Sequence, residues 1–181
     1  GWGVHYGFLN SFYGDPKIIC MVRDLRGVFA SMEKNFRKSQ HLSDEIVNHS
    51  EMTGTTTTKR VEAWSKSQPV GMAIERLQEI FTQGINQKML FIKFEDLTEN
   101  PENEIKKIYE YLGLPYYEGH DYKNVQQITQ EDDSVYGAYG DHVIKPEIKP
   151  LKKDFVEILG QGTCDSIKNS YKWFYDIFQY N

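Results

Sequence analysis

Arg23 and Ser31 are the two residues whose types and spacing could together hold an anion. Arg23 directly follows the apolar run Lys17–Val22, and Ser31 lies eight positions further on. The guanidinium of arginine offers a planar fork of donors that suits two phosphate oxygens, and a serine hydroxyl adds another donor. The spacing therefore predicts a phosphate site between these side chains. The alternative stays open that Arg23 pairs with Asp24 or Asp96 and that Ser31 is an ordinary helix residue.

The helix expected after Arg23 would place Ser31 on a polar flank. Five apolar residues recur at helical spacing and predict one buried stripe: Leu25, Val28, Phe29, Met32 and Phe36. At 100° per residue, Ser31 falls about 120° from the centre of that stripe. Gly27, Lys34 and Lys38 fall on the same flank, so that Lys34 is a candidate to assist with an anion. The alternative is that these lysines are solvated, as most helix-surface lysines are.

Two short apolar runs, Lys17–Val22 and Met89–Phe94, predict the buried strands that position these residues. Three helical patterns are also present. The first covers 59–83, with an interruption near Pro69 and an end at Gly84. The second begins at Asn100-Pro101 and ends at Gly113, and the third covers about 163–179. Strands that alternate with helices indicate an α/β fold, with a parallel sheet flanked by helices. Ligands of such a sheet bind at the carboxyl ends of its strands, where Arg23 is expected.

The whole chain, residues 1–181, is interpreted as a single domain. It contains a long loop at about 39–58 and an irregular segment at about 115–150. Hydrophobic residues make up 39% and charged residues 26%, which is typical of a globular protein. No apolar run reaches the roughly 20 residues that span a bilayer, and no signal peptide is recognisable. We therefore expect a cytoplasmic location and no membrane partner.

The distribution of charge favours a small anionic ligand. The net charge of −5 argues against a nucleic-acid partner. Residues 15–40 nevertheless carry six Lys or Arg against three Asp or Glu, whereas residues 95–133 carry three Lys against eleven acids. Two distant cysteines and five scattered histidines lack the spacing of metal ligands, so we expect no metal.

Three segments resemble sulfotransferases that use 3'-phosphoadenosine-5'-phosphosulfate (PAPS). PKIICMVRDLRGVFASM resembles the motif that binds the 3'-phosphate, and Arg23 and Ser31 match its Arg and Ser. KMLFIKFEDLTENPENEIKKIYEYLGL resembles the strand, acidic turn and helix further along, with Phe94 where the family often has Tyr. DHVIKP resembles a segment of tyrosylprotein sulfotransferases whose lysine, here Lys145, reaches the cofactor phosphates. A solvated lysine before a proline is the alternative for Lys145.

The resemblance implies a fold like that of P-loop nucleotide hydrolases, with PAPS as co-substrate and no metal. It implies that Arg23 and Ser31 bind the 3'-phosphate, assisted by Lys145 and Lys34. The family also has a glycine- and hydroxyl-rich loop for the 5'-phosphosulfate. No such loop precedes Arg23, so we expect the fold to be incomplete at the N-terminus; Thr53–Arg60 follows no strand and is expected to cap a helix.

The reaction also requires a base, which the family supplies upstream of the Arg–Ser motif. His5 is the candidate there, with an ordinary surface histidine as the alternative. We interpret the chain as a sulfotransferase acting on a hydroxyl of a sugar, small molecule or tyrosine. One alternative is a non-catalytic module that binds the nucleotide. Another is a nucleotide kinase, although the sequence has no Gly-x-x-x-x-Gly-Lys-Ser/Thr loop.

Overall fold

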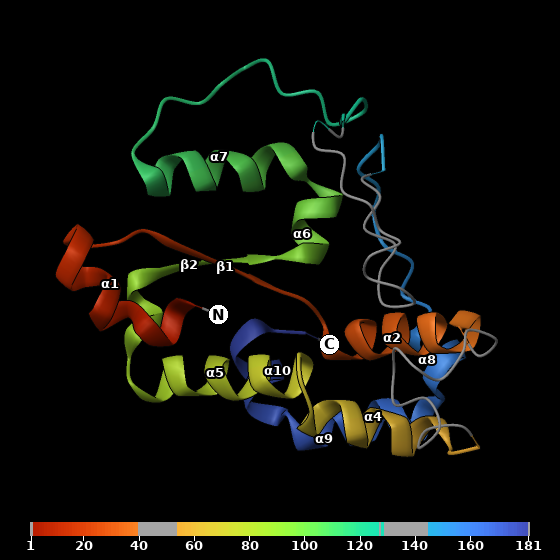
Figure 1. Ribbon diagram of the computed structural model, residues 1–181. Helices are drawn as coiled ribbons and strands as arrows, with labels where there is room; N and C mark the ends of the chain where they lie inside the picture. The colour runs from red at the N-terminus through yellow and green to blue at the C-terminus, as the bar shows by residue number, and fades with distance from the viewer. Residues whose placement is uncertain (1, 40–53, 127, 129–144, 181) are drawn as a thin grey trace. The chain divides into compact units, whose positions relative to one another are not determined.

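A computed structural model describes residues 2–39, 54–126, 128 and 145–180 (Figure 1). Most of the predicted loop at 39–58, and the middle of the irregular segment at 115–150, lie outside these residues. The chain forms two compact units, which are described separately below. The single domain expected for residues 1–181 stays a prediction.

The two predicted strands form a parallel pair in the first unit, which comprises residues 1–23, 64–125 and 145–151. Strand β1 (Ile18–Val22) pairs with β2 (Met89–Lys93), in a register that sets Ile18 opposite Met89 and Val22 opposite Lys93. The hydroxyl of Tyr111 extends the ladder at its start, because it accepts from the amide of Ile18 at 3.2 Å and donates to the carbonyl of Lys88 at 2.9 Å. The predicted α/β architecture is confirmed.

Continuous burial of β1 was expected from its apolar run, and this expectation is wrong. Val22 is buried, but Ile19 and Met21 are 37% and 53% exposed. Successive side chains of a strand point to opposite faces, so Ile19 and Met21 lie on the face that Val22 does not share.

Helices flank the strand pair on both sides within this unit. Helix α7 lies on one side and α5 on the other (Figure 1). The buried apolar side chains of the unit are Val22, Ile74, Ile80 and Ile92. Its helical elements are η1 (Trp2–His5), α1 (Tyr6–Tyr13), α5 (Val70–Thr82), η2 (Ile85–Lys88), α6 (Phe94–Glu99) and α7 (Pro101–Leu112).

The second unit comprises residues 24–63, 126–144 and 152–181, and its described part is helical. Helix α4 begins in this unit and ends in the first. The helices are α2 (Leu25–Ser39), α4 (Thr57–Lys66), α8 (Phe155–Leu159), α9 (Gln161–Ser170) and α10 (Lys172–Phe178). Three residues of the predicted stripe, Leu25, Phe29 and Phe36, are buried, and α2 contacts both α8 and α9.

The helix boundaries confirm the predictions that rested on local signals. The interruption near Pro69 separates α4 from α5, and Gly84 and Gly113 follow helices with φ of 71° and 69°. The single helix expected at 163–179 is instead two helices, because Tyr171 leaves helical geometry at φ −116° and ψ 35°. Helices η1, α1, η2, α6 and α8 were not predicted, and Phe94, which was expected to end the second strand, begins α6 instead. Within the described ranges, no helix has the length and apolar character needed to cross a membrane.

Candidate functional site

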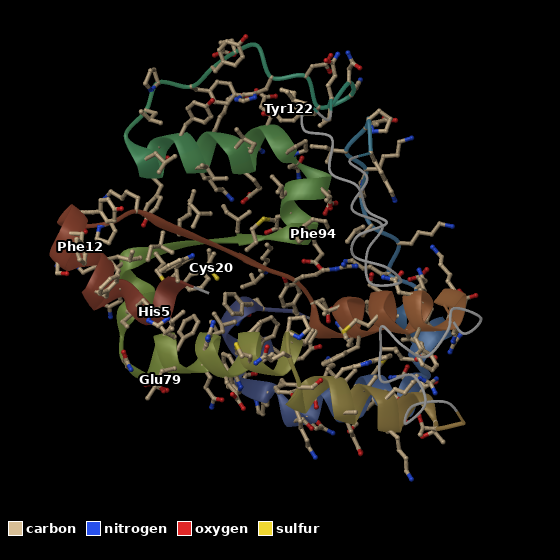
Figure 2. The ribbon with its side chains drawn as sticks, in the orientation of Figure 1. His5, Phe12, Cys20, Glu79, Phe94 and Tyr122 are labelled. Atoms are coloured by element: carbon tan, nitrogen blue, oxygen red, sulfur yellow. The ribbon has the colours of Figure 1, made fainter. Side chains whose placement is uncertain are left out.

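Arg23 lies at the carboxyl edge of the strand pair, as predicted. Because Val22 is opposite Lys93, the next residues of the two strands, Arg23 and Phe94, leave the sheet at the same edge. The guanidinium carbon of Arg23 lies 5.3 Å from the centre of the Phe94 ring, a cation–π contact. Figure 2 shows Phe94 at this end of the strands. Arg23 therefore contacts the phenylalanine that stands where the resembled sulfotransferases often have tyrosine.

Asp24 sets the start of α2 directly after Arg23. Its carbonyl accepts from the amide of Val28 at 3.0 Å, and its carboxylate accepts from the amide of Arg26 at 2.9 Å, which is an N-cap arrangement. The buried carboxylate also binds Nη2 of Arg26 at 2.6 Å and the hydroxyl of Tyr175 at 3.0 Å. Burial, followed by the nearby Asp24 charge, raises the pKa of Tyr175 well above its ordinary value. The hydroxyl of Tyr175 therefore stays protonated and donates to Asp24.

Ser31 and Lys34 share α2 in the second unit. Ser31 is half-buried, and Lys34 is exposed. The ammonium of Lys34 forms an ion pair with Asp154 at 2.7 Å, which holds the pKa of Asp154 below its ordinary value. A phosphate at Lys34 would thus compete with this carboxylate. The predicted roles of both residues stay predictions.

Lys145 and His5 belong to the first unit, Lys145 outside any helix or strand and His5 at the end of η1. Lys145 is exposed, and the chain beside it is fixed by hydrogen bonds from the amide of Val125 to the carbonyl of Pro146 at 2.7 Å and from Ile148 to Tyr122 at 3.0 Å. Residues 141–144 of the DHVIKP segment lie outside the described residues. His5 ends η1 and is exposed, and it lies towards the amino ends of the strands, away from Phe94 (Figure 2). The roles of Lys145 and His5 stay predictions.

The threonine-rich segment before α4 caps that helix, as expected. The hydroxyl of Thr56 accepts from the amide of Lys59 at 3.3 Å, and its carbonyl accepts from the amide of Arg60 at 3.1 Å. These bonds satisfy amides of the first helical turn.

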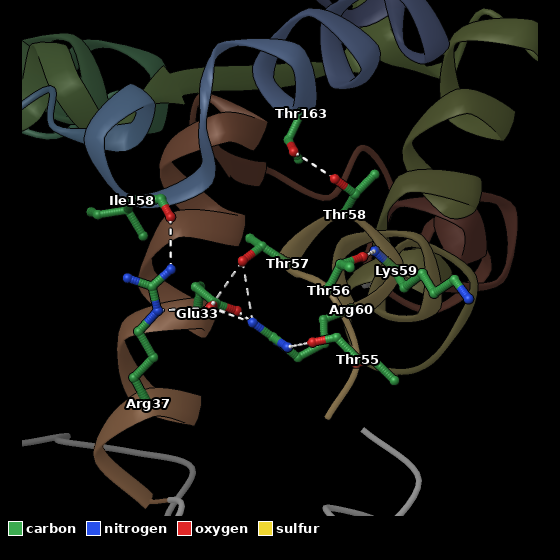
Figure 3. Close-up of polar contacts among 10 residues, drawn as sticks. All are labelled: Glu33, Arg37, Thr55, Thr56, Thr57, Thr58, Lys59, Arg60, Ile158 and Thr163. Carbon is green, nitrogen blue, oxygen red and sulfur yellow. Dashed lines mark hydrogen bonds and ion pairs between the residues drawn. The ribbon is translucent and has the colours of Figure 1, made fainter. Parts of the chain in front are cut away.

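An ionic cluster around the buried Glu33 of α2 was not recognised in the sequence (Figure 3). Glu33 has no exposed side-chain surface, and it accepts from Arg60 at 2.6 and 2.8 Å and from Arg37 at 2.8 Å. The hydroxyl of Thr57 donates to it at 3.4 Å. Burial would raise the pKa of Glu33, but hydrogen bonds from Arg60 and Arg37 outweigh it and hold the pKa below its ordinary value. Glu33, Arg37, Thr57 and Arg60 are called the Glu33 cluster below.

The i, i+4 spacing of Glu33 and Arg37 could have predicted a surface pair. The burial of Glu33 depends instead on Arg60, which lies 27 residues away along the chain. No local pattern in the sequence predicts that Glu33 and Arg60 come into contact.

One hollow of about 320 Å³ lies in the first unit, where α6 meets α7. None of the predicted site residues lines it. Its walls are Glu99, Asn100, Pro101, Glu102, Asn103, Tyr122, Lys123, Glu147 and Ile148. Among the described residues, no group of His, Cys, Asp or Glu is arranged to hold a metal ion.

Comparison with known proteins decides the family. The model of the sulfotransferase domain matches residues 5–150, most of the chain. The chain belongs to the sulfotransferase domain family. Its α/β architecture, a parallel strand pair between helices, is that of this sulfotransferase domain. The matched range includes His5, Arg23, Ser31, Lys34 and Lys145.

The sulfotransferase domain is also similar to curated relatives. Carbohydrate sulfotransferase 1 of rat and of mouse are each 29% identical to it over 137 residues, and the human protein is 28% identical. Each match covers 70% of this chain and 31% of the relative, so the chain spans about a third of their length. No solved structure matches the chain significantly.

Proposed function

We propose that this sulfotransferase domain takes part in transferring a sulfuryl group from PAPS to a hydroxyl acceptor. The family supports sulfotransfer, and the names of the relatives favour a sugar hydroxyl over a tyrosine or another small molecule. The observation that carries the proposal is Arg23, held against Phe94 at the carboxyl edge of the parallel strands. This is the edge where ligands of α/β sheets bind.

Each proposed ligand residue has a distinct task. Arg23 would bind two oxygens of the 3'-phosphate through its fork of donors, and Ser31 would donate one hydroxyl hydrogen bond. Lys145 and Lys34 would add positive charge, Lys34 after leaving Asp154. Together they would orient PAPS for in-line attack of the acceptor oxygen on sulfur. The bond from sulfur to the 5'-phosphate oxygen would break as the new S–O bond forms, and 3',5'-adenosine bisphosphate would leave. The acceptor proton would pass to a base, for which His5 remains the candidate of this chain.

The first prediction tests the nucleotide site. Calorimetric titration with 3',5'-adenosine bisphosphate should show binding by the wild type, and Arg23→Ala should weaken it by about 2–4 kcal/mol, because a charge-assisted phosphate contact is lost. Arg76→Ala is the matched control, since it removes the same charge from the middle of α5 and should leave the affinity unchanged.

Two outcomes would contradict the proposal. If the wild type and Arg23→Ala bind the bisphosphate with equal affinity, Arg23 is not a ligand of the 3'-phosphate. If the folded wild type does not bind the bisphosphate, the proposal that this chain binds PAPS is wrong. Transfer of radiolabelled sulfate from PAPS to sugar acceptors then separates an enzyme from a module that binds the nucleotide without turnover. Phosphoryl transfer from ATP in place of sulfuryl transfer would favour the kinase alternative.

A further inference from the structure

Glu33 is a charged side chain with no exposed surface, in the middle of a helix that carries a proposed ligand residue. Burying a carboxylate is costly even when it is paired. Replacing a buried ion pair by apolar residues of similar volume is often neutral or stabilising. Folding by itself therefore does not require a charge at position 33, and a role in placing the helix would account for it.

The contacts of the Glu33 cluster restrain α2 from several directions. Arg60 binds both carboxylate oxygens through Nε and Nη2, and its Nη1 donates to the carbonyl of Thr55. Arg37 donates to Glu33 and, through Nη2, to the carbonyl of Ile158 at 2.9 Å. These bonds join α2 to the start of α4 and to α8 (Figure 3). Because the bonds are directional, they oppose both rotation and sliding of α2.

Ser31 lies on the other side of α2 from Glu33. Two residues along a helix turn the side chain by about 200°. Glu33 is accordingly buried against α4, whereas Ser31 is only half-buried. Any rotation of α2 that moves Glu33 also moves the hydroxyl of Ser31. All the residues involved belong to the second unit.

We propose that Glu33, bound by Arg60, is a positioning residue that sets the rotation of α2 and thereby the place of Ser31 in the 3'-phosphate site. The inference rests on the proposed function, because it assigns Ser31 to that phosphate. Apolar side chains of similar volume at positions 33 and 60 could stabilise the unit equally well. Only the directional pair holds the helix at one angle.

The experiment replaces the pair by apolar residues. Glu33→Met/Arg60→Met should keep the melting temperature within a few degrees of the wild type. Its affinity for 3',5'-adenosine bisphosphate should fall on the order of tenfold, since the Ser31 hydroxyl is misplaced. Affinity for adenosine 5'-phosphosulfate, which lacks the 3'-phosphate, should not change. In a Ser31→Ala background the double replacement should have no further effect, because the two changes act on one interaction.

A matched control and a second variant keep the test decisive. Glu102→Met/Lys106→Met removes an exposed ion pair of α7 and should leave both affinities unchanged. Arg60→Lys keeps the positive charge beside Glu33 but loses the two-point contact, and should show the same selective loss even if the double Met variant does not fold.

The outcomes separate the two proposals. If the wild type binds the bisphosphate and folded Glu33→Met/Arg60→Met and Arg60→Lys bind it equally well, the positioning role is wrong and the proposed function stands. Equal losses for both nucleotides would also overturn the positioning role. If the folded wild type does not bind the bisphosphate, the proposed function fails and the positioning role fails with it.

Discussion

Asp24 and Glu33 are two carboxylates of the α2 region that the structure buries, each beside an arginine. Asp24 binds Arg26, and Glu33 binds Arg60. In both pairs the arginine also lies over an aromatic ring: Arg26 is 4.4 Å from the centre of Phe155, and Arg60 is 4.5 Å from that of Phe36. The aromatic rings shield the guanidinium groups from solvent, and the carboxylates accept hydrogen bonds from the guanidinium N–H groups.

A further prediction for a single residue concerns Glu33 and how its contribution to the free energy of unfolding changes with pH. Its pKa is lower in the folded chain than in the unfolded chain, so the ionised form stabilises the fold above the ordinary pKa. This contribution is lost as the pH falls through the lowered pKa. Glu33→Gln should therefore cost about 3 kcal/mol near pH 7, because Arg60 stays buried without its counter-charge. The difference from the wild type should begin to shrink as the pH falls below about 5.

Urea denaturation of both proteins at each pH measures this difference. The remaining acids titrate in wild type and variant alike, so their contributions cancel. A difference in unfolding free energy that stays constant or grows towards pH 3 would show that Glu33 does not carry a lowered pKa.

At the scale of elements, α7 ends by a local mechanism. Gly113 follows the helix at φ 69°, and its amide donates to the carbonyl of Glu110 at 3.0 Å. The next residue, Leu114, donates to the carbonyl of Tyr109 at 3.0 Å. A left-handed residue at this position satisfies the last carbonyls of a helix.

The prediction at this scale compares two glycines. A Cβ on Gly113 would meet nothing within 4 Å, so the cost of Gly113→Ala is conformational, about 1 kcal/mol of unfolding free energy. Gly162, inside α9, also has open space around its Cβ position but no positive φ. Gly162→Ala should therefore stabilise by about 0.5 kcal/mol. Thermal unfolding of the two variants should show shifts of opposite sign, and equal shifts would refute the argument.

At the scale of the whole molecule, contacts between distant segments hold the second unit together. The bond from Tyr175 to Asp24 joins residues 151 positions apart and ties α10 to the start of α2. Tyr175→Phe keeps the ring in the core and removes only the hydroxyl. It should lower the unfolding free energy by about 1–2 kcal/mol, because a buried carboxylate loses a donor.

Tyr171→Phe is the control for this prediction, since Tyr171 lies on the same C-terminal stretch and is only half-buried. Its effect should stay within about 0.5 kcal/mol. Urea denaturation measures both variants, and a Tyr175→Phe protein as stable as the control would show that the long-range bond contributes nothing.

The sequence alone determined the parts of this protein that depend on neighbours along the chain. Apolar runs located β1 and β2, and Pro101 and Gly113 bounded α7, because strand periodicity and helix ends are local properties. The position of Arg23 after β1 followed from the same run. The resemblance to sulfotransferases followed from three segments, residues 16–32, 88–114 and 141–146, and the match of the family model to residues 5–150 confirms the family.

Only the tertiary structure decided which distant residues meet. The register of β1 with β2 brings Phe94 against Arg23, and the folding of α4 against α2 converts Glu33 from a surface charge into a buried one. The break at Tyr171 and the exposure of Met21 likewise went unpredicted. The burial and pairing of a side chain depend on the residues that pack against it. These residues lie tens of positions away along the chain, and hydrophobic periodicity within one helix or strand does not identify them.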